Sequence, residues 1–154
     1  MSFHVRINPY SHLEALASYH LQAVREKQNL DGPTGIRLDS MSCLIALAFS
    51  VEALLNLVGS RKVPEWKERS AFMTKMKLLE LRLGFEFQDD QEPFSTVSRL
   101  KRARDKMAHG QPVSFILDSD DTNELSRAMQ SPWADSTTPE FVIHAYAEVQ
   151  KFKA

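Results

Sequence analysis

The chain has 154 residues, of which 43% are hydrophobic and 25% are charged, which predicts one globular domain with a buried core. Its formal net charge of −1 excludes a surface that attracts nucleic acid or anionic membranes as a whole, so any phosphate-binding site has to be local. The lone cysteine, Cys43, excludes an intramolecular disulfide and a Cys-rich zinc site. The first residues, MSFHVRIN, lack the apolar run of a secretory leader, so we expect a protein of the reducing cytoplasm.

The first third of the chain predicts a short strand followed by two helices. Residues 3 to 7 alternate between apolar and polar side chains, which is typical of a strand. From about 9 to 29, apolar residues recur three and four positions apart, which indicates a helix. The turn sequence DGPTG at 31 to 35 ends that helix. A second helix, capped by Asp39 or Ser40, then extends to about Val58.

The second helix is apolar on nearly all sides, which raises the question of a membrane span. Its apolar run from 41 to 59 is interrupted by Glu52 and Asn56, and a spanning helix rarely tolerates both. We therefore expect a buried helix at the centre of a bundle, with no membrane contact.

Two further helices follow in the middle of the chain. Pro64 stands at a favoured first helical position, and the apolar face that follows it ends at Gly84. Pro93 begins a fourth helix that extends to about His109. Gly110 then fits the position just past a helix end, where a left-handed backbone is expected.

The last quarter of the chain mixes a second alternating segment with helical patterns. Residues 112 to 118 alternate and could pair with residues 3 to 7 as a short two-stranded β ribbon. Helical patterns follow at about 121 to 130 and 139 to 152.

These elements predict an all-α fold built as a single domain over residues 1–154. We expect an antiparallel four-helix bundle as its core, at about 10–111. The remainder, at about 112–154, is expected to form a C-terminal helical extension.

The end of the fourth helix concentrates charge in a nearly neutral protein. Five cations lie within eight residues: Arg99, Lys101, Arg102, Arg104 and Lys106. Asp105 and His109 are four residues apart, so their side chains could touch and orient the imidazole ring. The free carbonyls at a helix C-terminus also favour imidazolium. The segment is therefore a candidate phosphodiester site, with a solvated helix end as the alternative interpretation.

The arginine–histidine spacing alone is not specific. Arg6 and His12 have a similar spacing, but they lie on either side of the break at Asn8 and Pro9. Arg104 and His109 lie on one uninterrupted helical pattern, which distinguishes the two pairs.

RDKMAHG at 104–110 resembles the R-polar-x-x-x-H signature of HEPN domains, which are helical nucleotide-binding modules. SVEALLN at 50–56 is similar to a Glu-Ala-x-x-Asn stretch on an earlier core helix of that family. The order of the predicted helices also agrees with that of the family, and the resemblance covers about residues 10–111. It departs from the family at Asp105, where asparagine is frequent.

The resemblance implies a metal-independent endoribonuclease that acts as a homodimer and leaves a 2′,3′-cyclic phosphate. By motif position, His109 would be the general acid or base, Arg104 would hold the scissile phosphate and Asp105 would orient the histidine. Five residues turn a helix by 500°, so Arg104 and His109 point about 140° apart. A site shared between two chains would bring them together.

Four more side chains are candidates for substrate binding: Arg102, Lys106, Glu52 and Asn56. Glu52 and Asn56 are one helical turn apart, and the interpretation that we favour for this pair is that they attach a neighbouring helix or loop. Cys43 fits a small core residue, and His12 and His20 lack the carboxylates of a metal site. The sequence predicts no metal and no cofactor.

Two classes of function therefore stay open. The first is RNA cleavage by a homodimer in a toxin–antitoxin or defence setting. The second is a non-catalytic HEPN-like homodimer that binds a nucleotide or a partner protein, such as an antitoxin or a nucleotidyltransferase.

Overall fold

The computed structural model describes residues 7–32, 34–110, 112, 114, 116, 121–124 and 130–154. This part of the chain is helical, as predicted, and contains no strand. Its elements are α1 (Pro9–Lys27), α2 (Ile36–Lys62), α3 (Phe72–Leu83), α4 (Phe94–Ala108), the short 3-10 helix η1 (Ala134–Ser136) and α6 (Pro139–Lys153). The β ribbon predicted from residues 3–7 and 112–118 falls mostly outside the described residues.

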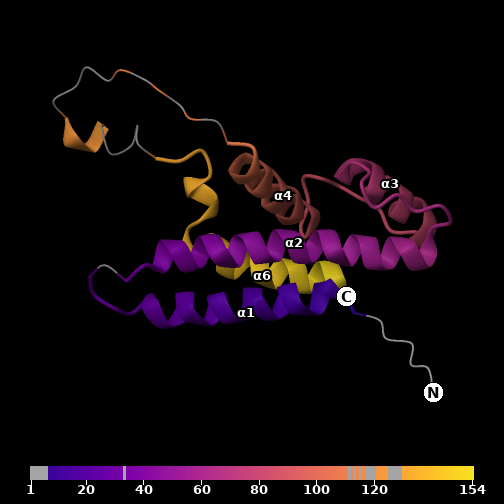
Figure 1. Cartoon of the computed structure of the whole chain (residues 1–154), viewed down its shortest axis with the longest axis horizontal. Helices are drawn as coiled ribbons and strands as arrows, with labels where there is room; N and C mark the ends of the chain where they lie inside the picture. The colour runs from indigo at the N-terminus through magenta and orange to yellow at the C-terminus, as the bar shows by residue number, and fades with distance from the viewer. Residues whose placement is uncertain are drawn as a thin grey trace.

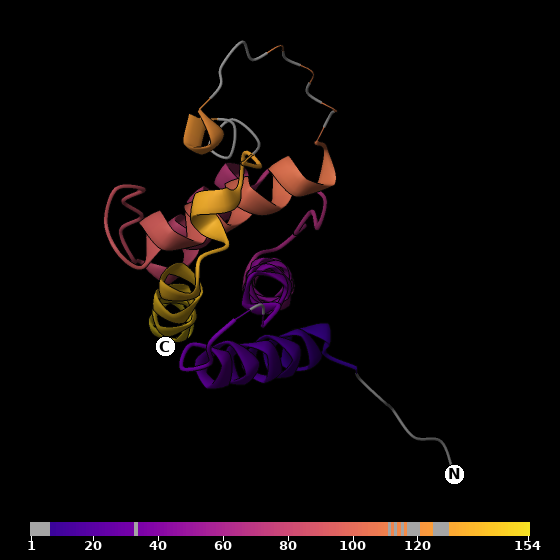
Figure 2. The same cartoon turned by 90° about the vertical axis from the view of Figure 1, so that its left-hand side faces the viewer.

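The helix α2 is the central element of the fold. It packs against α1, α3, α4 and α6 (Figure 1). The view along α2 shows α1 and α6 on one side of it and α4 crossing on the other (Figure 2). Because neighbours surround α2, apolar side chains are buried around much of its circumference, which explains its nearly uniform apolar sequence. By length and composition α2 could also cross a membrane, although 44% of its most apolar 18-residue stretch is buried in the fold.

The C-terminal helix α6 belongs to the core, although the sequence placed it in an extension. Val142, Ala145 and Val149 are almost completely buried, and α6 contacts α1, α2 and α4. The apolar spacing of this segment predicted a helix, but it could not predict which surface that helix covers.

The helix α3 lies at the edge of the molecule and packs mainly on α2. It begins at Phe72, later than the predicted start at Pro64, because the intervening residues form turns. One residue of this turn segment, Glu65, has a φ of +57°. Gly84 ends α3 in the left-handed conformation, as expected, with a φ of +76°.

Gly110 does not adopt the left-handed conformation that its sequence position predicts. The helix α4 ends at Ala108, and its C-cap is His109, whose φ is −115° and whose N–H donates to the carbonyl oxygen of Asp105 at 2.9 Å. A Cβ added at Gly110 would lie 2.9 Å from the carbonyl oxygen of Lys106. Glycine fits at position 110 because a side chain there would lie too close to the backbone of α4.

Candidate functional site

The helix α4 presents a line of exposed cationic side chains to solvent. Arg102, Lys106 and His109 follow one another by four and three residues, so they lie along one side of the helix. All three are exposed, and within the described residues no ion pair involves their side chains. We call these three residues the α4 cationic stripe.

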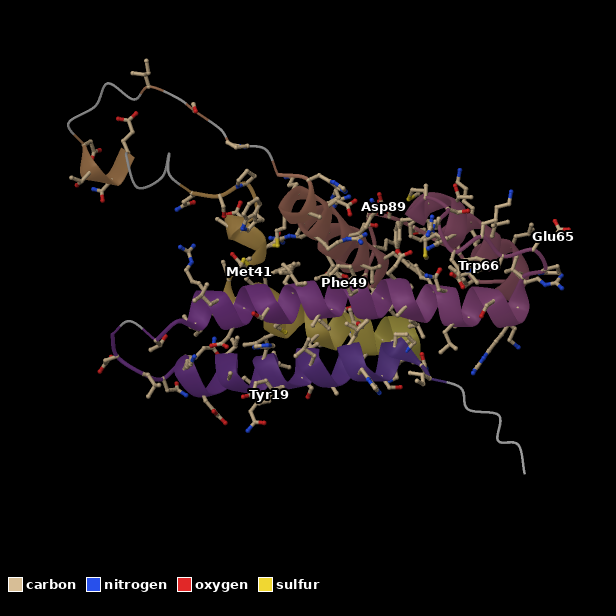
Figure 3. The ribbon with its side chains drawn as sticks, viewed as in Figure 1. Tyr19, Met41, Phe49, Glu65, Trp66 and Asp89 are labelled. Atoms are coloured by element: carbon tan, nitrogen blue, oxygen red, sulfur yellow. The ribbon has the colours of Figure 1, made fainter. Side chains whose placement is uncertain are left out.

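Arg104 lies on a different side of α4 from this stripe. Its guanidinium carbon is 5.4 Å from the centre of the Phe49 ring on α2, and its Nε is 3.0 Å from Oδ1 of Asp105. The Nε–Oδ1 contact is an ion pair by distance, but its alignment falls outside that of a hydrogen bond. Figure 3 shows Phe49 on the edge of α2 that lies toward α4. One chain therefore does not bring Arg104 and His109 to a common point.

Asp105 has two cationic partners, and the ring of His109 is not one of them. Its carboxylate pairs with the ammonium of Lys101 one helical turn earlier and with Arg104. The hydrogen bond between Asp105 and His109 runs through the backbone. The expected orienting contact between the carboxylate and the imidazole is thus replaced by contacts to two cations.

Glu52 and Asn56 attach the segment that contains α3 to the central helix. Glu52 forms an ion pair with Lys75 of α3, whose side chain is buried. Asn56 Oδ1 accepts a hydrogen bond from the indole N–H of Trp66 at 3.2 Å. A Cβ at Gly59 would lie 2.3 Å from that indole, so the ring packs directly on the α2 backbone. These contacts agree with the interpretation that assigned the pair a structural role.

A cavity of about 330 Å³ lies beside the cationic stripe. It is lined by Arg102 and Lys106 from α4 and by Trp133 and Asp135 from the segment around η1. Arg99 also lines it, but its guanidinium donates to the carbonyl oxygen of Asp135 at 2.8 Å and has a structural role. Arg102 and Lys106 therefore remain as the cations available to a ligand.

Trp133 lies at the C-terminal end of α4. A Cβ added at Gly110 would be 3.5 Å from Cζ3 of this indole, so the ring lies next to the residue that follows His109. An aromatic face beside cations suits a nucleobase beside phosphates. No local pattern in the sequence indicates this position of Trp133, because residues 110 and 133 are far apart in the chain.

The rest of the described chain offers little other chemistry. It contains no group of three or more histidine, cysteine or acidic side chains close enough to hold a metal ion. Burial raises the pKa of the Cys43 thiol to about 12, and the thiol donates to the carbonyl oxygen of Ala17. A thiol with this pKa is a poor nucleophile at neutral pH.

Comparisons of the chain with protein-family models, with curated proteins and with solved structures found no match. The resemblance to HEPN domains therefore rests on two motifs, at Arg104–His109 and at Glu52–Asn56. The second motif has structural partners in this chain, so functional inference depends on the α4 end.

Proposed function

We propose that the protein is a metal-independent endoribonuclease of HEPN type that binds RNA along α4. The observation that supports this proposal is the alignment of an exposed imidazole with two cations that have no acidic partner within the described residues. Arg102 and Lys106 would contact successive phosphates, and the Trp133 indole would stack on a base. The site is local, as the net charge of −1 requires.

The proposed chemistry needs a base, an acid and an internal nucleophile. The neutral ring of His109 takes the proton of a ribose 2′-hydroxyl, and the 2′-oxygen attacks the adjacent phosphorus. The bond from phosphorus to the 5′-oxygen breaks, and an imidazolium protonates that leaving oxygen. The products are a 2′,3′-cyclic phosphate and a 5′-hydroxyl. Because the ribose supplies the nucleophile, the substrate is RNA.

A homodimer would complete this site. Arg104 points about 140° away from His109, so a second copy is needed to bring an arginine to the same phosphate. Leu38 and Phe49 are 66% and 41% exposed, and they lie on one side of α2, with Arg104 packed against the Phe49 ring. This apolar strip beside Arg104 is the surface that we assign to the second copy.

The direct test is cleavage of a fluorescent RNA by the His109→Ala variant in the presence of chelator. We expect activity to fall by at least about 100-fold, as for loss of a general acid–base group. The matched control is His12→Ala, which removes an exposed histidine on α1 and should leave cleavage unchanged. Near wild-type cleavage by His109→Ala would contradict the role of this residue.

Mixing two inactive variants tests whether the site is shared between copies. Arg104→Ala and His109→Ala chains, mixed and allowed to exchange, should regain about a quarter of wild-type activity, because half of the dimers are mixed and each has one intact site. No recovery, with exchange demonstrated, would contradict the shared site.

The second candidate is a non-catalytic homodimer that binds a partner protein or a nucleotide. It is favoured by the pairing of Asp105 with Arg104 and Lys101, which offsets positive charge that a scissile phosphate would need. This alternative predicts that the wild-type protein yields no cyclic phosphate from RNA and co-purifies with its partner. Either function suits a protein of the cytoplasm.

A further inference from the structure

A carboxylate lines the cavity beside the α4 cationic stripe. Asp135 of η1 shares this cavity with Arg102, Lys106 and Trp133, and among the described residues that line it no other is acidic. The Asp135 side chain is exposed, and within the described part of the chain its carboxylate forms no ion pair. Neither cation of the cavity pairs with it, so charge pairing within the fold does not account for its position.

This carboxylate disfavours phosphates and favours hydrogen-bond donors. A negative charge near Arg102 and Lys106 weakens their attraction for a phosphate. An ionised carboxylate has two acceptor oxygens and no donor, so it suits a ligand group that carries N–H or O–H. Because Trp133 lines the same cavity and its ring suits stacking on a base, the edge of that base is the part of an RNA that meets Asp135.

The neighbouring serine adds a donor to this wall of the cavity. Ser136 Oγ accepts a hydrogen bond from Arg99 Nε at 3.2 Å, and within the described residues its own proton has no acceptor. Arg99 also donates to the main-chain oxygen of Asp135 at 2.8 Å, and its guanidinium carbon lies 3.9 Å from the centre of the Phe141 ring. These contacts attach η1 to α4 and hold a hydroxyl donor next to a residue with two carboxylate acceptors.

We propose that Asp135 and Ser136 select guanine as the base that stacks on Trp133. Guanine presents N1–H and the N2 amino group next to each other, and these two donors match the two carboxylate oxygens of Asp135. Its O6 lies beside N1 and accepts the proton of Ser136. This inference rests on the proposed binding of RNA along α4, and it adds the identity of one base to it.

The other three bases match this wall less well. Uracil has one N–H between two carbonyl oxygens, and the Asp135 carboxylate repels both of them. Adenine and cytosine each present one amino group beside a ring nitrogen that is itself an acceptor, so one carboxylate oxygen stays without a donor. Guanine is therefore the base that supplies a donor to each oxygen of Asp135.

The experiment compares two 2′-O-methyl oligouridines that carry one central guanine or one central hypoxanthine. Hypoxanthine keeps O6 and N1–H but lacks the N2 amino group. The wild-type protein should bind the guanine oligonucleotide about tenfold more tightly, as for one hydrogen bond to a charged group. Fluorescence anisotropy measures the ratio of the two affinities. Neither oligonucleotide is cleaved or has a 2′-hydroxyl, so neither catalysis nor a contact to the sugar hydroxyl produces this ratio.

The variant Asp135→Ala links the preference to the carboxylate. The ratio of the two affinities should fall to about one, while the affinity for both oligonucleotides rises because a negative charge beside the phosphates is removed. The matched control is Glu140→Ala, which removes an exposed carboxylate of α6 that does not line the cavity. It changes the net charge equally and should keep the tenfold ratio.

Two results overturn the guanine assignment and leave RNA binding along α4 standing. One is equal affinity of the wild type for the guanine and hypoxanthine oligonucleotides, which needs no variant to be measured. The other is a preference for guanine that persists in Asp135→Ala. Failure of the wild type to bind either oligonucleotide is a different result, because it contradicts RNA binding itself and removes the basis of the guanine assignment.

Discussion

Two clusters of polar side chains, one on α2 and one on α4, occur at helical spacing but differ in what they contact. On α2, Glu52 and Asn56 each have a partner in the segment that contains α3, and Gly59 leaves room for the Trp66 ring. On α4, the side chains of the cationic stripe extend into solvent beside a cavity, and within the described residues they have no acidic partner.

This difference separates structural polar residues from available ones. A polar group that is satisfied inside the fold contributes to stability, and its loss leaves its partner unsatisfied. A cation without a partner does little for the fold, so its replacement should affect binding and leave stability nearly unchanged. The two clusters therefore predict opposite responses to substitution.

The largest expected effect is on the α2 cluster. Glu52→Leu leaves the buried ammonium of Lys75 without its counter-charge and should lower the free energy of unfolding by about 3 kcal/mol. This value is at the low end for a buried pair because the Glu52 side chain is 28% exposed. Urea unfolding followed by circular dichroism measures the change.

Replacing both partners sharpens this test. Glu52→Leu combined with Lys75→Met removes both charges and should recover most of the stability that the single substitution removes. Glu14→Leu, at a more exposed ion pair with Lys153, serves as a control and should cost less. If Glu52→Leu were neutral for stability but abolished RNA binding, the assignment of the two clusters would be reversed.

The next effect concerns the aromatic wall of the cavity beside the stripe. Trp133→Ala should weaken binding of single-stranded RNA by about tenfold, because one base can no longer stack on an aromatic ring. Fluorescence anisotropy with a labelled RNA measures the affinity. Tyr19→Ala removes an exposed ring on α1 and should leave the affinity unchanged. Equal weakening in the two variants would argue against a base at Trp133.

The smallest expected effect is a pH dependence of stability that comes from Asp39, a residue that belongs to neither cluster. The hydrogen bond from Lys27 holds the pKa of the Asp39 carboxyl below its ordinary value of 3.8, although burial opposes this shift. Since the folded-state pKa is the lower one, the stabilisation is complete above 3.8 and is lost as the pH falls through the folded-state value.

The variant Asp39→Asn isolates this contribution. The wild type should exceed it in stability by at most about 1 kcal/mol at pH 5, as for a partly exposed ion pair, and by less at pH 3. Urea unfolding at the two pH values measures both differences, with Asp31→Asn in the exposed loop as the control. A difference that grows toward pH 3 would contradict the assigned direction.

Local patterns predicted the parts of the fold that depend on local physics. The all-α class, the extent of α1 and the end of α3 at Gly84 followed from apolar spacing and from turn residues. The arrangement of a HEPN-type four-helix bundle stays a prediction. The predicted start of α3 at Pro64 was wrong because Pro64 lies in a turn. Trp66, two residues later, lies outside any helix, and its indole is held by Asn56 of α2.

The features of the fold that the sequence did not predict depend on contacts between segments that are distant in the chain. The burial of α6 against α1, α2 and α4 follows from the tertiary fold, and its own sequence could not reveal it. The same is true of Trp133 beside Gly110 and of Arg104 beside Phe49. The candidate residues on α4 were thus found from sequence, whereas the cavity beside them required coordinates.

The most direct test of the central claim measures the salt dependence of RNA affinity. A 2′-O-methyl oligoribonucleotide lacks the attacking hydroxyl and therefore binds without being cleaved. Replacing Arg102 and Lys106 with alanine should reduce the slope of log affinity against log salt by about 1.4, or about 0.7 for each phosphate that is no longer neutralised. The control pair Arg25→Ala and Arg37→Ala, at exposed positions on α1 and α2, should keep the wild-type slope. Equal slopes for all three proteins would contradict RNA binding along α4.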